Sequence, residues 1–252
     1  MTGGKGARRR LDALLVDRGL VETRGRAQAL IMAGLVWSGD RRLDKPGILL
    51  LPASPIEVKR RDHPWVSRGG LKLVRALDHF SIDPTGGVAL DIGASTGGFT
   101  DVLLARGAGR IYAVDVGYGQ LAAKLRENSR VVLLERVNAR NLTRAQVPES
   151  VDLIVCDASF IGLEVVLPAP LALAAESARL IALIKPQFEV GKGKVGKGGV
   201  VRDPALRHAV CDRIVAWLSA QAGWRVEGLI ESPILGADGN QEFLVYARKH
   251  PA

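Results

Sequence analysis

A glycine-rich bend at residues 93–98 is the first segment whose spacing suggests ligand chemistry. The apolar run 88–92 precedes it, and a helix-like segment from Phe99 to Leu104 follows. A buried strand, a glycine turn and a helix present backbone N–H groups at the carboxyl edge of a sheet, where α/β folds bind nucleotides. The alternative is an ordinary strand-to-helix turn. It is disfavoured because two glycines in a first helical turn cost stability.

The charge beside this bend separates two possible ligands, a dinucleotide and S-adenosyl-L-methionine. Asp91 lies two residues before the first glycine. A carboxylate at the mouth of the loop would repel a pyrophosphate and attract the ammonium and sulfonium groups of S-adenosyl-L-methionine. The spacing is also Gly-x-x-x-Gly-Gly rather than the Gly-x-Gly-x-x-Gly of dinucleotide folds. The sequence therefore favours S-adenosyl-L-methionine, with a nicotinamide-dependent oxidoreductase as the alternative enzyme.

Polar residues recur at the ends of the later predicted strands, where ligands gather in parallel α/β sheets. Asp115 follows the glycines by about twenty residues, the spacing expected of a carboxylate that binds ribose hydroxyls. Asn138 and Ala139 fall where the adenine edge should lie. The residues predicted to contact the cofactor are Asp91, Gly93, Ala94, Ser95, Thr96, Gly97, Gly98, Phe99, Asp115, Val116, Asn138, Ala139 and Asp157.

Two lysines and two carboxylates are expected at the edges of the same crevice: Lys72, Asp157, Lys185 and Glu242. Methyl transfer to a ribose 2′-hydroxyl needs a base for a very weak acid, aligned with the methyl carbon. A lysine accepts a proton only as the neutral amine. A second ammonium nearby disfavours the charged form, whereas adjacent carboxylates favour it and fix its geometry. Two surface salt bridges are the alternative, each worth little. Because all four residues lie at strand ends or near the first helix, a catalytic cluster is favoured.

The elements that must position these residues alternate between strand and helix from residue 67 onward. We expect strands at 88–92, 111–116, 131–137, 151–156, 179–184, 225–231 and 242–247. We expect helices at 67–80, 98–105, 121–127 and 163–174, and one that Asp203 caps and Pro204 begins. Five parallel strands closed by a terminal hairpin predict an α/β fold with the seven-stranded, Rossmann-like sheet of class I methyltransferases.

The first quarter of the chain predicts a separate, basic α+β domain. Residues 1–63 hold 13 lysines and arginines against 7 acidic residues, whereas the remaining residues hold 22 against 19. Concentrated positive charge suggests a polyanionic partner, most simply a nucleic acid. Two short helices, a small sheet and the phrase TRGRAQALIMAGLVWSGD resemble the S-four-like RNA-binding domain of ribosomal proteins. We therefore predict this domain at 1–62, a linker at 63–67 and the methyltransferase domain at 68–252.

Basic side chains outside the crevice are expected to bind RNA. The segment GKGKVGKGG interleaves lysines with glycines shortly after Lys185. It is expected to be a mobile basic flap that orders on RNA phosphates, with a disordered surface loop as the alternative. The predicted RNA-binding residues are Arg8, Arg10, Arg24, Arg26, Arg41, Arg42, Arg68, Lys192, Lys194 and Lys197.

The composition disfavours membrane-spanning, exported, disulfide-rich and zinc-binding proteins. The longest apolar stretch, 165–184, is interrupted by prolines and charged residues, and no apolar signal core follows the first arginines. Cys156 and Cys211 are too few for a disulfide framework or a zinc site and are expected to be reduced, buried thiols. We therefore expect a cytoplasmic protein with no metal site and no stable membrane association.

Six segments in sequence order resemble the TlyA family, the so-called hemolysin A proteins. They are SRGGLKL, DIGASTGGFTD, ERVNARNL, CDASF, LIKPQFEVGKGKVGKGGVVRD and NQEFL. The resemblance implies a ribosomal RNA 2′-O-methyltransferase with an FtsJ-like catalytic domain behind the S-four-like domain. It also implies a Lys-Asp-Lys-Glu tetrad at Lys72, Asp157, Lys185 and Glu242, with Lys185 as the base. The implied substrate is a cytidine ribose in ribosomal RNA of assembled or nearly assembled subunits.

Two alternatives from other classes remain. A membrane-lysing protein, as the hemolysin name suggests, would need an amphipathic or spanning segment that the sequence does not show. An RNA-binding ribosome assembly factor with a non-catalytic methyltransferase-like domain would not need the intact glycines and all four tetrad residues.

Overall fold

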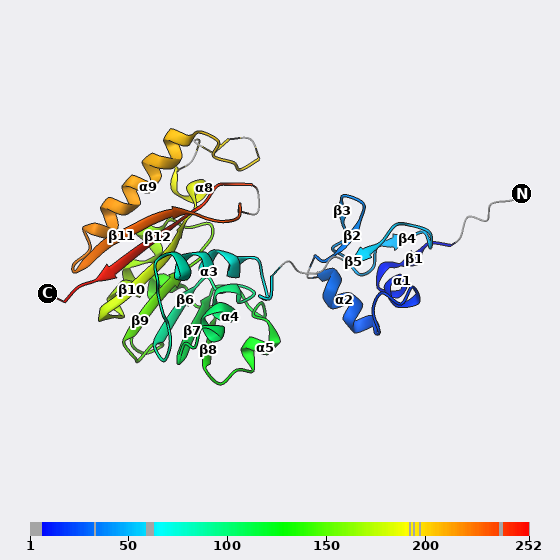
Figure 1. Ribbon diagram of the computed structural model, residues 1–252, viewed down its shortest axis with the longest axis horizontal. Helices are drawn as coiled ribbons and strands as arrows, with labels where there is room; N and C mark the ends of the chain where they lie inside the picture. Colours follow the sequence, from blue (N-terminus) through cyan, green and yellow to red (C-terminus); the bar gives the residue numbers. More distant parts are fainter. Residues whose placement is uncertain are drawn as a thin grey trace, which may run out of the picture. The chain divides into compact units, whose positions relative to one another are not determined.

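The computed structural model describes residues 7–32, 34–58, 63–191, 193, 195–196, 198–236 and 239–251 (Figure 1). The chain divides into two compact units, Met1–Pro64 and Trp65–Ala252. The division falls within the segment 63–67 that we assigned to a linker. The hydrophobic clusters of the described residues each lie within one unit.

The first unit is a small α+β structure. Its helices are α1 (Leu11–Asp17) and α2 (Arg24–Met32). The Thr23 hydroxyl accepts a hydrogen bond from the Arg26 N–H at 3.1 Å, so Thr23 caps α2. The strands are very short: β1 (Arg9–Arg10) pairs with β4 (Leu49–Leu50), and β2 (Val36–Ser38) lies between β3 (Arg41–Arg42) and β5 (Glu57–Val58). The strands β1 and β3 were not predicted, because paired arginines carry no apolar alternation.

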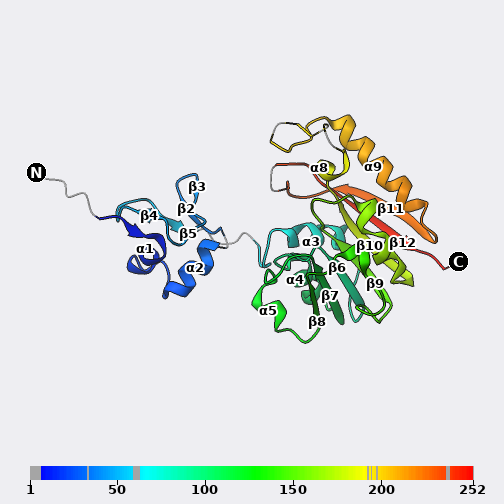
Figure 2. The same ribbon diagram turned by 180° about the vertical axis from the view of Figure 1, so that it is seen from behind.

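The second unit contains a seven-stranded sheet with helices on both faces (Figures 1 and 2). Its strands are β6 (Val88–Ile92), β7 (Arg110–Asp115), β8 (Val131–Glu135), β9 (Val151–Cys156), β10 (Ala174–Ile184), β11 (Trp224–Glu231) and β12 (Phe243–Lys249). They lie in the order β11-β12-β10-β9-β6-β7-β8, and only the pairs that include β12 are antiparallel. The predicted fold class is confirmed. The strand order reverses between β6 and β9, where an α/β sheet opens a crevice.

Two layers of helices bury the faces of this sheet. On one face, α3 (Gly69–His79) and α4 (Gly98–Ala105) contribute Leu73, Leu77 and Leu103 to a core. On the other, α6 (Leu163–Val166), α7 (Pro168–Ala172) and α9 (Pro204–Ser219) pack against a second core. The carboxylate of Asp203 accepts a hydrogen bond from the Ala205 N–H at 2.9 Å, as expected of a cap.

Two predicted helices are shorter than the hydrophobic pattern suggests. The helix expected over 163–174 is split into α6 and α7, because Pro168 lacks an N–H and begins a new helix instead of continuing the first. In consequence β10 starts at Ala174, five residues before the predicted start. The helix expected over 121–127 is the single turn α5 (Ala123–Arg126).

Candidate active site

A cavity of about 420 Å³ opens at the carboxyl ends of β6, β7 and β9. Seven of the residues predicted to bind the cofactor line it: Gly93, Ser95, Asp115, Val116, Asn138, Ala139 and Asp157. Three further polar or aromatic residues in its wall were not predicted: Gln120, Ser159 and Phe160. Of these, Ser159 and Phe160 belong to the CDASF segment, so that motif was the available signal. Within the described lining the charged residues are Asp115 and Asp157, which makes the wall acidic.

Asp115 holds the glycine bend in place while lining the cavity. Its Oδ2 accepts a hydrogen bond from the Ser95 N–H at 2.8 Å, and its Oδ1 accepts one from the Gly117 N–H at 2.7 Å. These bonds join the bend after β6 to the loop after β7. Asp115 therefore positions two segments of the wall and presents a carboxylate between them.

Gly93 is required by a close approach of two strand ends. Its φ is +79°, and a Cβ here would lie 2.9 Å from the Cα of Ala158. Any other residue would push the CDASF segment away from the bend. The cavity wall at this point is therefore formed by backbone, as the spacing predicted.

The pair Gly97-Gly98 serves packing, and its contact with the cofactor stays a prediction. A Cβ on Gly97, whose φ is +97°, would lie 2.3 Å from Cδ1 of Leu125. A Cβ on Gly98 would lie 2.2 Å from Oγ of Ser67 and 3.0 Å from N of Gly70. These glycines let α4 pack against α5 and against the start of α3, and both lie outside the cavity lining.

Three more of the predicted cofactor contacts also lie outside the lining. The Phe99 side chain belongs to the core between α4 and the sheet, and Ala94 belongs to the core beside α5. Thr96 accepts a hydrogen bond from the Ala122 N–H through its carbonyl oxygen at 3.2 Å. The contacts predicted between these three residues and the cofactor stay predictions.

Asp91 does not lie at the mouth of the loop, which corrects the prediction. It is fully buried on the α4 side of β6, where the Thr100 hydroxyl donates a hydrogen bond to its Oδ2 at 2.6 Å. Its Oδ1 makes no hydrogen bond to any described residue. Burial raises the pKa of Asp91 to about 7, although the hydrogen bond from Thr100 opposes this shift.

The raised pKa of Asp91 predicts a specific pH dependence of stability. An unfolded aspartate releases its proton near pH 4 and folded Asp91 near pH 7, so the folded state binds more protons between these values. The free energy of unfolding should therefore fall as pH rises from 4 to 7, by up to about 4 kcal/mol. In Asp91→Asn this fall should be absent, measured by chemical denaturation at pH 5 and pH 8. The exposed control Asp212→Asn should keep it; equal pH dependence in all three proteins would contradict the prediction.

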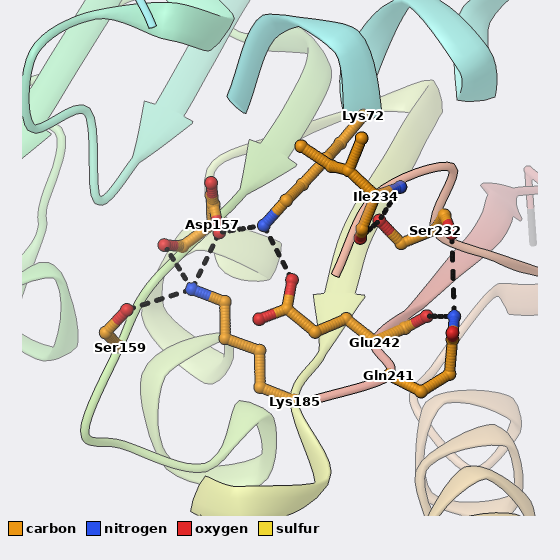
Figure 3. A network of polar contacts seen from close by, with 8 residues as sticks. All are labelled: Lys72, Asp157, Ser159, Lys185, Ser232, Ile234, Gln241 and Glu242. Carbon is orange, nitrogen blue, oxygen red and sulfur yellow. Dashed lines mark hydrogen bonds and ion pairs between the residues drawn. The ribbon is translucent and has the colours of Figure 1, made fainter. Parts of the chain in front are cut away.

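The four charged residues predicted to cooperate come together beside the cavity (Figure 3). The Lys72 Nζ donates a hydrogen bond to Glu242 Oε2 at 2.6 Å and lies 4.0 Å from Asp157 Oδ1. The Lys185 Nζ lies 2.7 Å from the same Asp157 oxygen. Asp157 thus stands between the two lysines. The four residues come from α3 and from the ends of β9, β10 and the segment before β12.

Burial argues against two ordinary surface salt bridges. Lys72, Lys185 and Glu242 are each less than a tenth exposed. The desolvation of buried charges costs several kcal/mol each, and hydrophobic residues of similar volume would often be as stable. A buried charge cluster is therefore not explained by a gain in folding stability. Because this one lies beside a cavity, we interpret it as a catalytic cluster.

The turn before β12 encloses the Glu242 carboxylate. A Cβ on Gly236 would lie 2.4 Å from Glu242 Oε1, and the Gly236 N–H donates a hydrogen bond to the Asn240 carbonyl at 2.8 Å. The buried Asn240 side chain accepts a hydrogen bond from the Val201 N–H and donates one to the Gly199 carbonyl, both at 2.9 Å. These two bonds attach Gly199, the last residue of the GKGKVGKGG segment, and the nearby Val201 to the turn that holds Glu242.

The predicted RNA-binding residues differ in their surroundings. Arg10 and Arg24 both contact the fully buried Asp12, at 2.9 Å and 3.3 Å respectively. Hydrogen bonding from Arg10 is the largest cause that holds the pKa of Asp12 well below its ordinary value. Sequence reasoning missed Asp12, whose only signal is a charge among the apolar residues of α1. All seven predicted arginines are exposed, including Arg10 and Arg24, whereas Lys192, Lys194 and Lys197 lie outside the described residues.

Comparison with known proteins connects this site to a family. An FtsJ-like methyltransferase family model matches residues 65–249, and an S4 domain model matches residues 9–54. The 16S/23S rRNA (cytidine-2'-O)-methyltransferase TlyA of Mycobacterium tuberculosis is 49% identical over 242 residues, which is 96% of this chain and 90% of that protein. This chain belongs to the TlyA family. The resemblance seen in the sequence is confirmed.

Other TlyA-family likenesses extend over most of the chain. Hemolysin A of Brachyspira hyodysenteriae is 37% identical over 94% of this chain and 98% of its own length. The solved structure of a Streptococcus thermophilus protein, provisionally named a hemolysin, covers 97% of this chain and 89% of its own, with 39% identity and a TM-score of 0.73. Among the described residues, no helix combines the length and hydropathy of a membrane span.

A more distant likeness shows the fold alone. The N-methyltransferase NodS of Bradyrhizobium japonicum, solved with S-adenosyl-L-homocysteine, has a TM-score of 0.52 at 16% identity. It covers 75% of this chain and 89% of that structure. The sheet described above is therefore shared with methyltransferases outside the TlyA family.

Proposed function

We propose that this chain transfers a methyl group from S-adenosyl-L-methionine to the 2′-hydroxyl of a cytidine ribose in ribosomal RNA. The observation that carries the proposal is the buried cluster of Lys72, Asp157, Lys185 and Glu242 beside the cavity. Support comes from the TlyA relative named for this reaction. The partner is ribosomal RNA in assembled or nearly assembled subunits, which places the protein in the cytoplasm.

The cavity suits S-adenosyl-L-methionine better than a dinucleotide. Its described lining contains the carboxylates of Asp115 and Asp157 and no cationic side chain, so a pyrophosphate would meet repulsion without compensation. A volume of about 420 Å³ lies within the usual range for small-ligand pockets. Asp115 would hold the ribose, and Asn138 and Ala139 the adenine. When bound, the cofactor supplies an electrophilic methyl carbon on a sulfonium.

Lys185 is the base in this proposal. The ribose 2′-oxygen forms a bond to the methyl carbon as the carbon–sulfur bond breaks, and the 2′-hydroxyl proton passes to the neutral Lys185 Nζ. Asp157, 2.7 Å from that nitrogen, orients the amine. Lys72, held by Glu242 at 2.6 Å, lies 4.0 Å from the same Asp157 oxygen and completes the cluster around it.

Two measurements test the proposal. Calorimetric titration with S-adenosyl-L-methionine and with NAD in parallel should show binding of the first only; binding of NAD alone would overturn the methyltransferase assignment. Mapping of 2′-O-methylation on ribosomal RNA from cells with and without the protein should show a methylated cytidine that depends on it. Cofactor binding without any such nucleotide would favour the assembly-factor alternative.

A further inference from the structure

Three acceptors surround the Lys185 side-chain nitrogen (Figure 3). They are Asp157 Oδ1 at 2.7 Å, the Asp157 carbonyl oxygen at 3.1 Å and the Ser159 Oγ at 2.9 Å. An ammonium has three N–H groups to donate. The ammonium donates hydrogen bonds to the Asp157 carbonyl oxygen and to Ser159 Oγ, whereas Asp157 Oδ1 is an ion-pair partner that accepts no hydrogen bond from the described residues.

The neutral form of Lys185 needs a different partner for its lone pair. A carboxylate and a backbone carbonyl can only accept hydrogen bonds, so both Asp157 oxygens repel a lone pair. The Ser159 hydroxyl can either accept or donate, because its O–H rotates. Of the three contacts, it alone can serve both protonation states.

We propose that Ser159 is a positioning residue that directs the lone pair of neutral Lys185 toward the incoming ribose hydroxyl. This inference rests on the proposed function. When the amine is neutral, the two Asp157 oxygens, which can only accept, are expected to keep its N–H groups on their side, and its lone pair then lies on the Ser159 side. Ser159 also lines the cavity, and its hydroxyl, by donating to this lone pair, keeps it turned toward the side from which a ribose 2′-hydroxyl approaches.

The other charged groups around Lys185 do not supply this function. Asp157 faces it from the end of β9, and Lys72 and Glu242 complete the cluster from α3 and from the turn before β12. Cys156 lies at the end of β9, where burial raises the pKa of its thiol to about 12 and so keeps it protonated. The direction of the Lys185 lone pair is therefore set by Ser159 and Asp157.

The test compares methyl transfer by the full chain and by three serine variants. Ser159→Ala should lower kcat about 10–100-fold, because a misdirected base costs alignment. The KM and Kd for S-adenosyl-L-methionine should stay within threefold. Ser159→Thr keeps the hydroxyl on an exposed residue and should restore kcat to within threefold. Ser177→Ala, an exposed serine at the opposite end of β10 from Lys185, should match the wild type.

The pH profile separates orientation from charge. If Ser159 directs the lone pair, the loss in Ser159→Ala persists at pH 9.5, where more of the amine is neutral in both proteins. A loss that disappears at high pH, or a kcat equal to wild type, would overturn the inference. Melting temperature and cofactor Kd establish that each variant is folded. A wild-type chain that methylates no 2′-hydroxyl would instead refute the proposed function.

Discussion

Replacing Lys185 by alanine is expected to lower methyl transfer about 10²–10⁴-fold, the usual contribution of a general base. The loss is expected because no other amine of the cluster can accept the proton in its place. Lys72, the other amine of the cluster, donates to Glu242 at 2.6 Å and lies 4.0 Å from the Asp157 oxygen that Lys185 contacts at 2.7 Å, so it is not placed to replace Lys185. Affinity for S-adenosyl-L-methionine should change less than threefold, because Lys185 is absent from the cavity lining.

Lys185→Arg distinguishes a base from an ion-pair partner. A guanidinium keeps the positive charge beside Asp157 but is not deprotonated in proteins, so it cannot accept the hydroxyl proton. We expect the arginine variant to be as inactive as the alanine variant. The rate of single-turnover transfer of a labelled methyl group to ribosomal RNA measures the activity of both variants. Activity within tenfold of wild type in Lys185→Arg would show that Lys185 is not the base.

A matched lysine controls for the loss of an ion pair. Lys124 contacts Asp101 at 2.8 Å but is 58% exposed and lies on α5, away from the cluster. Lys124→Ala should keep methyl transfer within threefold of wild type. Removing Lys185 leaves Asp157 without its nearest cation, which destabilises a buried pair. The melting temperature of each variant therefore has to be measured beside its activity.

The tetrad could be predicted because topology alone brings strand ends together. The carboxyl ends of β9 and β10 lie side by side in any sheet of this order, so Asp157 and Lys185 had to be close. The sheet order alone does not predict that Lys72 and Glu242 join them. For that, the start of α3 and the segment before the antiparallel strand β12 must also reach the carboxyl edge of β9 and β10. Their positions followed from the family resemblance more than from spacing.

The direction of side chains around the glycine bend could not be predicted. Asp91 and Ile92 are neighbours in β6, and strand alternation sends them to opposite faces. The sequence motif does not say which face carries the cavity, so Asp91 was assigned to the wrong side. Ser159 and Gln120 were missed because a single hydroxyl or amide in a loop forms no recognisable sequence motif. Its role becomes visible only when the structure shows which residues surround it.

Removal of residues 1–61 is expected to weaken RNA binding and to reduce its salt dependence, while cofactor affinity stays unchanged. The first unit has its own core around Leu11, Ile31 and Val36, and the described cores of the second unit contain none of its residues. The second unit should therefore fold without the first. Each phosphate contact that is lost should reduce the slope of log K against log salt by about 0.7–0.9. Six of the predicted RNA-binding arginines are removed, so a fall of several units is expected.

Full-length variants assign this effect to particular arginines. Arg41→Gln with Arg42→Gln removes two exposed charges on β3 and should lower the salt slope by about 1.4–1.8 if each contacts one phosphate. Arg225→Gln removes an exposed charge on β11 in the other unit and should leave the slope unchanged. Filter binding of ribosomal RNA between 50 and 300 mM salt measures all of these proteins. Equal affinity and equal slope after truncation would refute the assignment of RNA binding to the first unit, because the second unit would then make the phosphate contacts by itself.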